Sequence, residues 1–142
     1  MRNRSRQPVL VGQLLQEDYP AAAGLLRPLL DDNTLVVVSS DFTHYGPRFR
    51  YLPFPDDAET PSRLEALDSG SLGYILDKNP QGFLDYRNRT GTTICGYQPV
   101  ALLLHLLPAD SRGELVSYAT SGQLTGDFGN SVSYMGIVFR TP

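Results

Sequence analysis

The sequence predicts an α/β fold in which a mostly parallel sheet is flanked by helices, and three observations indicate this class. Residues 34–39 form a β-branched run that is apolar at consecutive positions, which is typical of a strand buried on both faces of a parallel sheet. A shorter apolar run at residues 8–12 and a helical pattern precede it, so the order is strand, helix, strand. Two more strand patterns, residues 114–121 and 131–139, close the chain around a glycine-rich loop.

The first helix is predicted from leucines and alanines that recur at helical spacing within residues 13–30. Asp18 and Pro20 are typical of a helix start, which we therefore place near Tyr19.

The middle of the chain predicts a long loop followed by three helices. Residues 40–61 are rich in proline and aromatic side chains and follow a strand end, where ligands bind in open α/β sheets. Helices are expected at about residues 62–76, at about 80–88 with Asn79 as its cap, and at about 99–107, where apolar residues all round indicate burial.

The size and charge of the chain limit the classes of protein to which it can belong. We expect one domain over residues 1–142, with residues 1–6 as a flexible terminus. The formal net charge of -3 excludes the basic footprint of a nucleic-acid binder. The apolar run at residues 100–107 is far too short to span a bilayer, no signal-type stretch opens the sequence, and one cysteine cannot form an internal disulfide. These features favour the cytoplasm, with no membrane partner.

The densest group of polar side chains lies in residues 39–46. Asp41 and His44 are three residues apart after a strand, so they can converge on one ligand as acid and base or as metal ligands. The alternative is that Asp41 or Ser40 caps a turn while His44 forms a hydrogen bond with a backbone carbonyl. A serine protease-like triad has no support, because no G-x-S-x-G segment surrounds the serines.

Cys95 precedes a predicted helix, where backbone N–H groups and the helix dipole favour a thiolate that binds metal. A buried, inert cysteine is the alternative. His105 lies among leucines and is predicted to be a core histidine. The glycine-rich loop of residues 121–131 could line a pocket, but a hairpin connection explains it equally simply.

Three segments resemble the second half of the Memo family, called AmmeMemoRadiSam system protein B in prokaryotes. They are SSDFTHYGPRFRY (residues 39–51), TTICGYQP (92–99), and SYATSG with NSVSYMGIVF (within 117–139). The resemblance implies a fold related to the class III extradiol, non-haem iron dioxygenases, with Asp41, His44 and Cys95 in the position of the dioxygenase metal site.

One hypothesis is therefore a metal-dependent oxidoreductase-like site, with Cys95 and His44 as metal ligands and Asp41 and His44 as catalytic groups. A thiolate is a soft donor that suits iron or copper. Substrate-binding residues would be Ser40, Phe42, Tyr45, Arg48 and Tyr51. The alternative is a non-catalytic module with a vestigial active site, which binds a peptide or small molecule through exposed aromatics of the same loop.

The sequence departs from the family in length. Two histidines that family members carry in their N-terminal half have no counterpart, because His44 and His105 are the only histidines here. A half-sheet exposes an apolar edge, so we expect self-association or a complementing N-terminal half. The family's name also suggests AMMECR1-like and radical-SAM proteins as partners.

Overall fold

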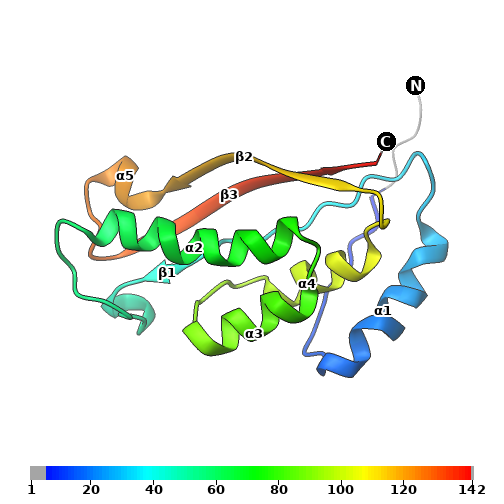
Figure 1. The fold of residues 1–142 in the computed structure, drawn as a ribbon, viewed down its shortest axis with the longest axis horizontal. Helices are drawn as coiled ribbons and strands as arrows, with labels where there is room; N and C mark the ends of the chain where they lie inside the picture. The colour runs from blue at the N-terminus through cyan, green and yellow to red at the C-terminus, as the bar shows by residue number, and fades with distance from the viewer. Residues whose placement is uncertain (1–5, 142) are drawn as a thin grey trace.

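The computed structural model describes residues 6–141 and has an α/β fold, but its sheet is antiparallel (Figure 1). Strands β1 (His44–Tyr45), β3 (Ser131–Arg140) and β2 (Arg112–Thr120) lie side by side in that order. The prediction of a mostly parallel sheet is therefore wrong for the described chain. The terminus predicted at residues 1–6 lies, except for Arg6, outside the described residues.

The two early strand predictions, at residues 8–12 and 34–39, are also wrong for the described chain by itself. Neither segment pairs with a strand within residues 6–141. In the second segment, Leu35 and Val37 are 85% and 77% exposed. A strand needs a neighbour that takes up its backbone hydrogen bonds, and the described residues supply none for either run.

The later strand predictions are confirmed, because β2 and β3 form one long antiparallel ribbon. The register pairs Arg112 with Arg140 at one end and Thr120 with Ser133 at the other, with an irregularity between Leu115 and Ser117. Side chains alternate along β3, so that Met135, Ile137 and Phe139 pack on the core.

The helices lie close to where the sequence predicts them. They are α1 (Tyr19–Leu26), α2 (Thr60–Leu76), α3 (Pro80–Thr90), α4 (Tyr97–Leu106) and a short α5 (Ser121–Thr125), with 3₁₀ turns at Gln16–Asp18, Arg27–Leu29 and Pro47–Phe49. The start of α1 at Tyr19 confirms the helix-start prediction. The Asn79 side chain accepts a 2.8 Å hydrogen bond from the Gly82 N–H, which confirms the predicted cap of α3.

The sequence did not predict α5, which lies within the loop interpreted as a hairpin connection. A reciprocal cap stabilises its start: the Thr120 side chain accepts from the Gln123 N–H at 3.1 Å, and the Gln123 side chain accepts from the Thr120 N–H at 2.9 Å.

The core lies between the β2–β3 ribbon and helices α2, α3 and α4, with α1 packed against α4 (Figure 1). His105, predicted as a core histidine, is half-buried on α4 and stacks on Tyr19 of α1, with ring centres 5.8 Å apart. Burial lowers the pKa of His105 below its ordinary value, because desolvation disfavours the charged ring. No helix among residues 6–141 has the length and hydrophobicity needed to cross a membrane.

Candidate metal site

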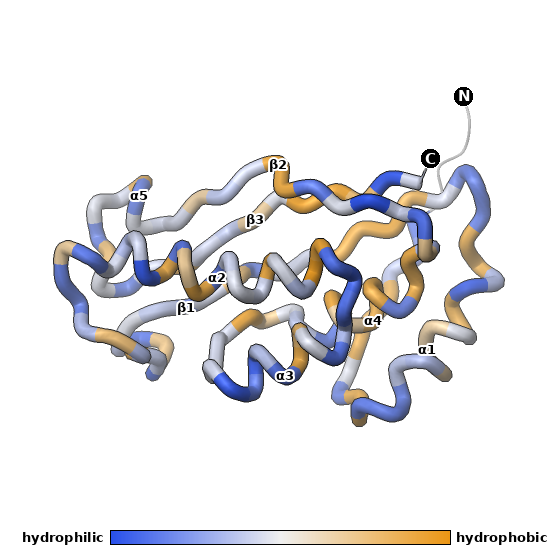
Figure 2. Tube along the Cα trace, viewed as in Figure 1, coloured by the Kyte–Doolittle hydropathy of each residue, from blue (hydrophilic) through white to orange (hydrophobic). Residues whose placement is uncertain are grey.

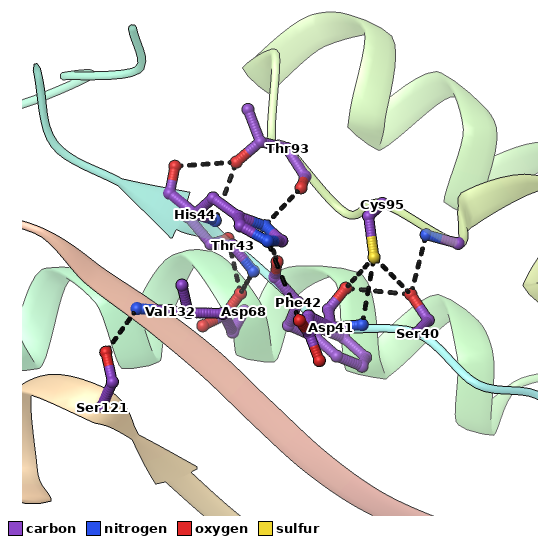
Figure 3. Close-up of polar contacts among 11 residues, drawn as sticks. Ser40, Asp41, Phe42, Thr43, His44, Asp68, Thr93, Cys95, Ser121 and Val132 are labelled. Carbon is purple, nitrogen blue, oxygen red and sulfur yellow. Dashed lines mark hydrogen bonds and ion pairs between the residues drawn. The ribbon is translucent and has the colours of Figure 1, made fainter. Parts of the chain in front are cut away.

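Asp41, His44 and Cys95 lie close together in space, although 54 positions separate the first and last of them (Figure 3). Asp41 lies in the segment that leads into β1, His44 begins β1, and Cys95 lies two residues before α4. One carboxylate oxygen, one ring nitrogen and the sulfur all lie within 4.8 Å of one another. The structure therefore brings together the three residues that the sequence selected as metal-ligating or catalytic.

The imidazole of His44 is oriented by two backbone carbonyl oxygens. Its Nδ1 lies 3.0 Å from the oxygens of both Phe42 and Thr93. Carbonyl oxygens only accept, so the proton of the neutral ring lies on Nδ1 and the lone pair on Nε2. Nε2 faces the Asp41 carboxylate, with 3.8 Å between Nε2 and Oδ2. The backbone contact foreseen as an alternative role of His44 thus leaves Nε2 available as a ligand or a proton acceptor.

The sulfur of Cys95 is held by the segment that carries Asp41. The Asp41 N–H donates to Sγ at 3.3 Å, and the Ser40 hydroxyl lies 3.9 Å from Sγ. These contacts fix the position of the sulfur relative to Asp41. Cys95 is exposed, so the alternative of a buried, inert cysteine is wrong.

Gly96 allows the two segments of the site to approach this closely. Its N–H donates to Ser40 Oγ at 2.9 Å. A Cβ atom at this position would lie 2.5 Å from the Ser40 Cβ, closer than real contacts allow, so only glycine fits.

A buried hydroxyl pair fixes the backbone next to His44. The Thr43 hydroxyl donates to Asp68 Oδ1 at 2.6 Å and lies 2.8 Å from the Thr92 hydroxyl, which can donate to it. One position further, Thr93 Oγ1 accepts from the His44 N–H at 2.8 Å and donates to the His44 carbonyl at 2.9 Å. These contacts join the segments at residues 42–44 and 92–93, and Figure 3 shows the contact of Thr43 with Asp68 and those of His44 with Thr93.

Asp68 is the charged residue that the sequence reasoning missed. It is fully buried on α2, and its carboxylate accepts from the Thr43 hydroxyl and from the Tyr118 hydroxyl, the latter at 2.9 Å. Burial raises the pKa of Asp68 although these hydrogen bonds oppose the shift, and burial also raises the pKa of Tyr118. One signal could have revealed it: Asp68 is four residues from Leu64 and from Leu72, on the inward face of its helix.

The structure places the other predicted site residues in different environments. Phe42 and Tyr45 are 4% and 0% exposed, so the expectation of an exposed aromatic surface is wrong for these two rings, which the core takes up instead. Tyr51 donates to the Thr90 carbonyl at 2.8 Å, and burial raises its pKa to about 12. Ser40 links Gly96 to the site, and Arg48 is exposed.

The fold and the site together define an α/β protein with a candidate three-ligand metal centre where the segment before β1 meets the segment before α4. Comparison with known sequences identifies the family: the model of the family described as Memo-like protein matches residues 7–138, and the chain belongs to this family.

Relatives come from animals and archaea. The chain is 33% identical over 135 residues to Protein MEMO1 of Danio rerio, covering 89% of this chain and 46% of the relative. It is 36% identical over 113 residues to a MEMO1 family protein of Methanopyrus kandleri, covering 78% of this chain and 35% of the relative. A memo-1 homolog of Caenorhabditis elegans is 30% identical to the chain over 146 residues, covering 95% of this chain and 42% of the relative. The chain thus spans less than half the length of these relatives.

Proposed function

We propose that this Memo-family chain binds one iron or copper ion through Cys95, His44 and Asp41, in a site for oxidation–reduction chemistry. The observation that carries the proposal is the convergence of thiol, imidazole and carboxylate within 4.8 Å. Thiolate and imidazole are donors that suit iron and copper, and three protein ligands leave positions open for a substrate.

The charges of the site support a cation. A thiolate and a carboxylate are both negative, and holding them close together costs free energy unless a positive charge lies between them. Within residues 6–141, His44 is the only basic side chain in ion-pair range of Asp41, and its Nε2 carries a lone pair in the neutral ring. A metal ion at this point would satisfy all three groups.

The residues of the chain hold the donors in place before a metal binds. The two carbonyls that accept from Nδ1 set the plane of the His44 ring and direct Nε2 toward the site. The Asp41 N–H orients Sγ of Cys95. A bound iron or copper ion would supply redox chemistry, and Asp41 or His44, where not engaged as a ligand, would accept a proton from a substrate.

Metal retention tests the proposal. The protein is purified without oxygen or chelator, loaded with Fe(II) or Cu(I), desalted, and analysed for metal by mass spectrometry. We expect stoichiometric metal in the wild type and loss of most of it in Cys95→Ser and His44→Gln, with circular dichroism showing an unchanged fold. His105→Gln is the matched control, because this second histidine stacks on Tyr19 and should retain the metal. Unchanged metal in Cys95→Ser would refute the site. Metal retained in His44→Gln, with loss in Cys95→Ser, would assign His44 to proton transfer instead.

A further inference from the structure

The segment at residues 35–39 is extended and carries apolar side chains on two sides. Leu35 and Val37 are 85% and 77% exposed, whereas Val36 is 40% exposed and Val38 packs against the core. This alternation is that of a strand with one face on the core and the other in solvent. Figure 2 shows the hydrophobic colour of the trace between α1 and β1.

The backbone of this segment has no hydrogen-bond partner in the described chain, and its outer side chains have no packing partner. Within residues 6–141, no backbone hydrogen bond involves residues 35–39, and pairing with β3 begins only where the Phe42 N–H donates to the Ser133 carbonyl. A row of free N–H and C=O groups beside exposed apolar side chains is a template for strand addition.

A second segment repeats the arrangement. Val9 and Leu10 are 59% and 99% exposed, Val11 packs against the core, and residues 9–11 likewise have no backbone partner in the part of the chain that the structure describes. Both runs are apolar at consecutive positions, a pattern that requires cover on both faces. The described chain covers only one.

The length of the relatives indicates what supplies the cover. The matched region is 46% of the Danio rerio protein and 35% of the Methanopyrus kandleri protein, so more than half of each relative lies outside it. We propose that residues 9–11 and 35–39 are interface strands that pair with the complementing part of a Memo domain, the part of the relatives that this chain does not match. The occupant that fits these segments is an apolar strand at a sheet edge with free backbone N–H and C=O groups, rather than a charged peptide.

The position of the segment connects this interface to the metal site. Residues 35–39 run directly into Ser40 and Asp41, and both Asp41 and Cys95 are open to solvent on the described chain. An occupant paired along 35–39 would end beside these side chains and could limit access of water to them. Pairing itself does not depend on the proposed metal, so the two proposals can fail separately.

Co-purification tests the interface. This chain is co-expressed with the unmatched part of Danio rerio MEMO1 as a separate polypeptide, and the mass of the complex is measured by native mass spectrometry in EDTA, which removes any influence of metal. The matched part of the Danio rerio protein with the same polypeptide serves as the reference pair. We expect a complex of one copy of each, weakened more than about tenfold by Val37→Lys or Leu35→Lys, since a lysine would place a charge in an apolar interface.

The control variant is Leu124→Lys on α5, where the side chain is 81% exposed but belongs to neither interface segment. It should bind like the wild type. Failure of this chain to form a complex, with or without success of the reference pair, would overturn the proposal. So would equal binding by Val37→Lys, or a dimer of this chain alone that Val37→Lys dissociates, because a second copy would then be the occupant.

Discussion

The buried hydroxyl of Thr43 offers the sharpest test of how the site is held together. Replacing Thr43 with valine keeps the shape and removes only the hydroxyl, which donates to Asp68 at 2.6 Å and lies 2.8 Å from the Thr92 hydroxyl. Thr43, Asp68 and Thr92 are all at most 1% exposed, so water cannot replace the lost bonds.

The expected cost follows from these two contacts. A hydrogen bond to a charged group contributes roughly 1.5–3 kcal/mol, and a buried hydroxyl left without its partner costs about 1 kcal/mol or more. The methyl group that valine adds in place of the hydroxyl offsets part of this. We therefore expect Thr43→Val to lower the free energy of unfolding by about 3 kcal/mol. Thr43→Ser keeps the hydroxyl and loses one methyl group, so it should cost about 1 kcal/mol.

Urea unfolding of the two variants, followed by circular dichroism, measures the difference. The slope of the transition should stay constant, so that the shift in midpoint reports stability alone. A Thr43→Val variant no less stable than Thr43→Ser would refute the reasoning, because the hydroxyl would then contribute less than a single methyl group.

Three further predictions concern other positions. Burial raises the pKa of Asp68 above its ordinary 3.8, so the stability that this group contributes is present below the unfolded pKa and is lost as pH rises through the folded pKa. In Asp68→Asn, urea unfolding at several pH values should no longer show this loss. A pH profile of stability identical to that of the wild type would contradict the assignment. Gly96→Ala places a Cβ 2.5 Å from that of Ser40, so it should lower the free energy of unfolding by about 1–3 kcal/mol and weaken metal retention. Gly73→Ala meets nothing within 4 Å and should stabilise α2 by about 0.5–1 kcal/mol, both effects being measured by thermal unfolding. Equal effects of the two substitutions would argue against a close approach at Gly96. Asn79→Ala removes the cap of α3 and should cost about 1 kcal/mol in urea unfolding, and a neutral effect would mean that water replaces the cap.

The helices and the late strands could be predicted because their signals are local. Asp18 and Pro20 mark the start of α1, Asn79 caps α3, and the alternating pattern of β3 depends only on neighbouring residues. The convergence of Asp41 with His44 could also be predicted, since a spacing of only three residues lets two side chains approach each other. Cys95 could be added through its family segment, but no local pattern indicates that it lies against Asp41.

The parallel sheet was predicted wrongly because strand pairing is not a local property. The run at residues 34–39 has the composition of a doubly buried strand, yet a strand exists only where another segment accepts its hydrogen bonds. Asp68 escaped prediction for a similar reason. Its burial beneath Thr43 requires α2, β1 and β2 to pack together, and a charged residue within a helix is usually exposed.

The sequence by itself determined the approximate positions of helices α1 to α4, the β2 and β3 strands and the three donor types of the site, because propensity, capping and side-chain chemistry depend on residues close in the chain. Only the tertiary structure decided the antiparallel order of the sheet, the exposure of Leu35 and Val37, and the distance from Cys95 to Asp41. These depend on contacts between segments tens of residues apart, whose free energies are settled by packing and by the pairing of buried polar groups.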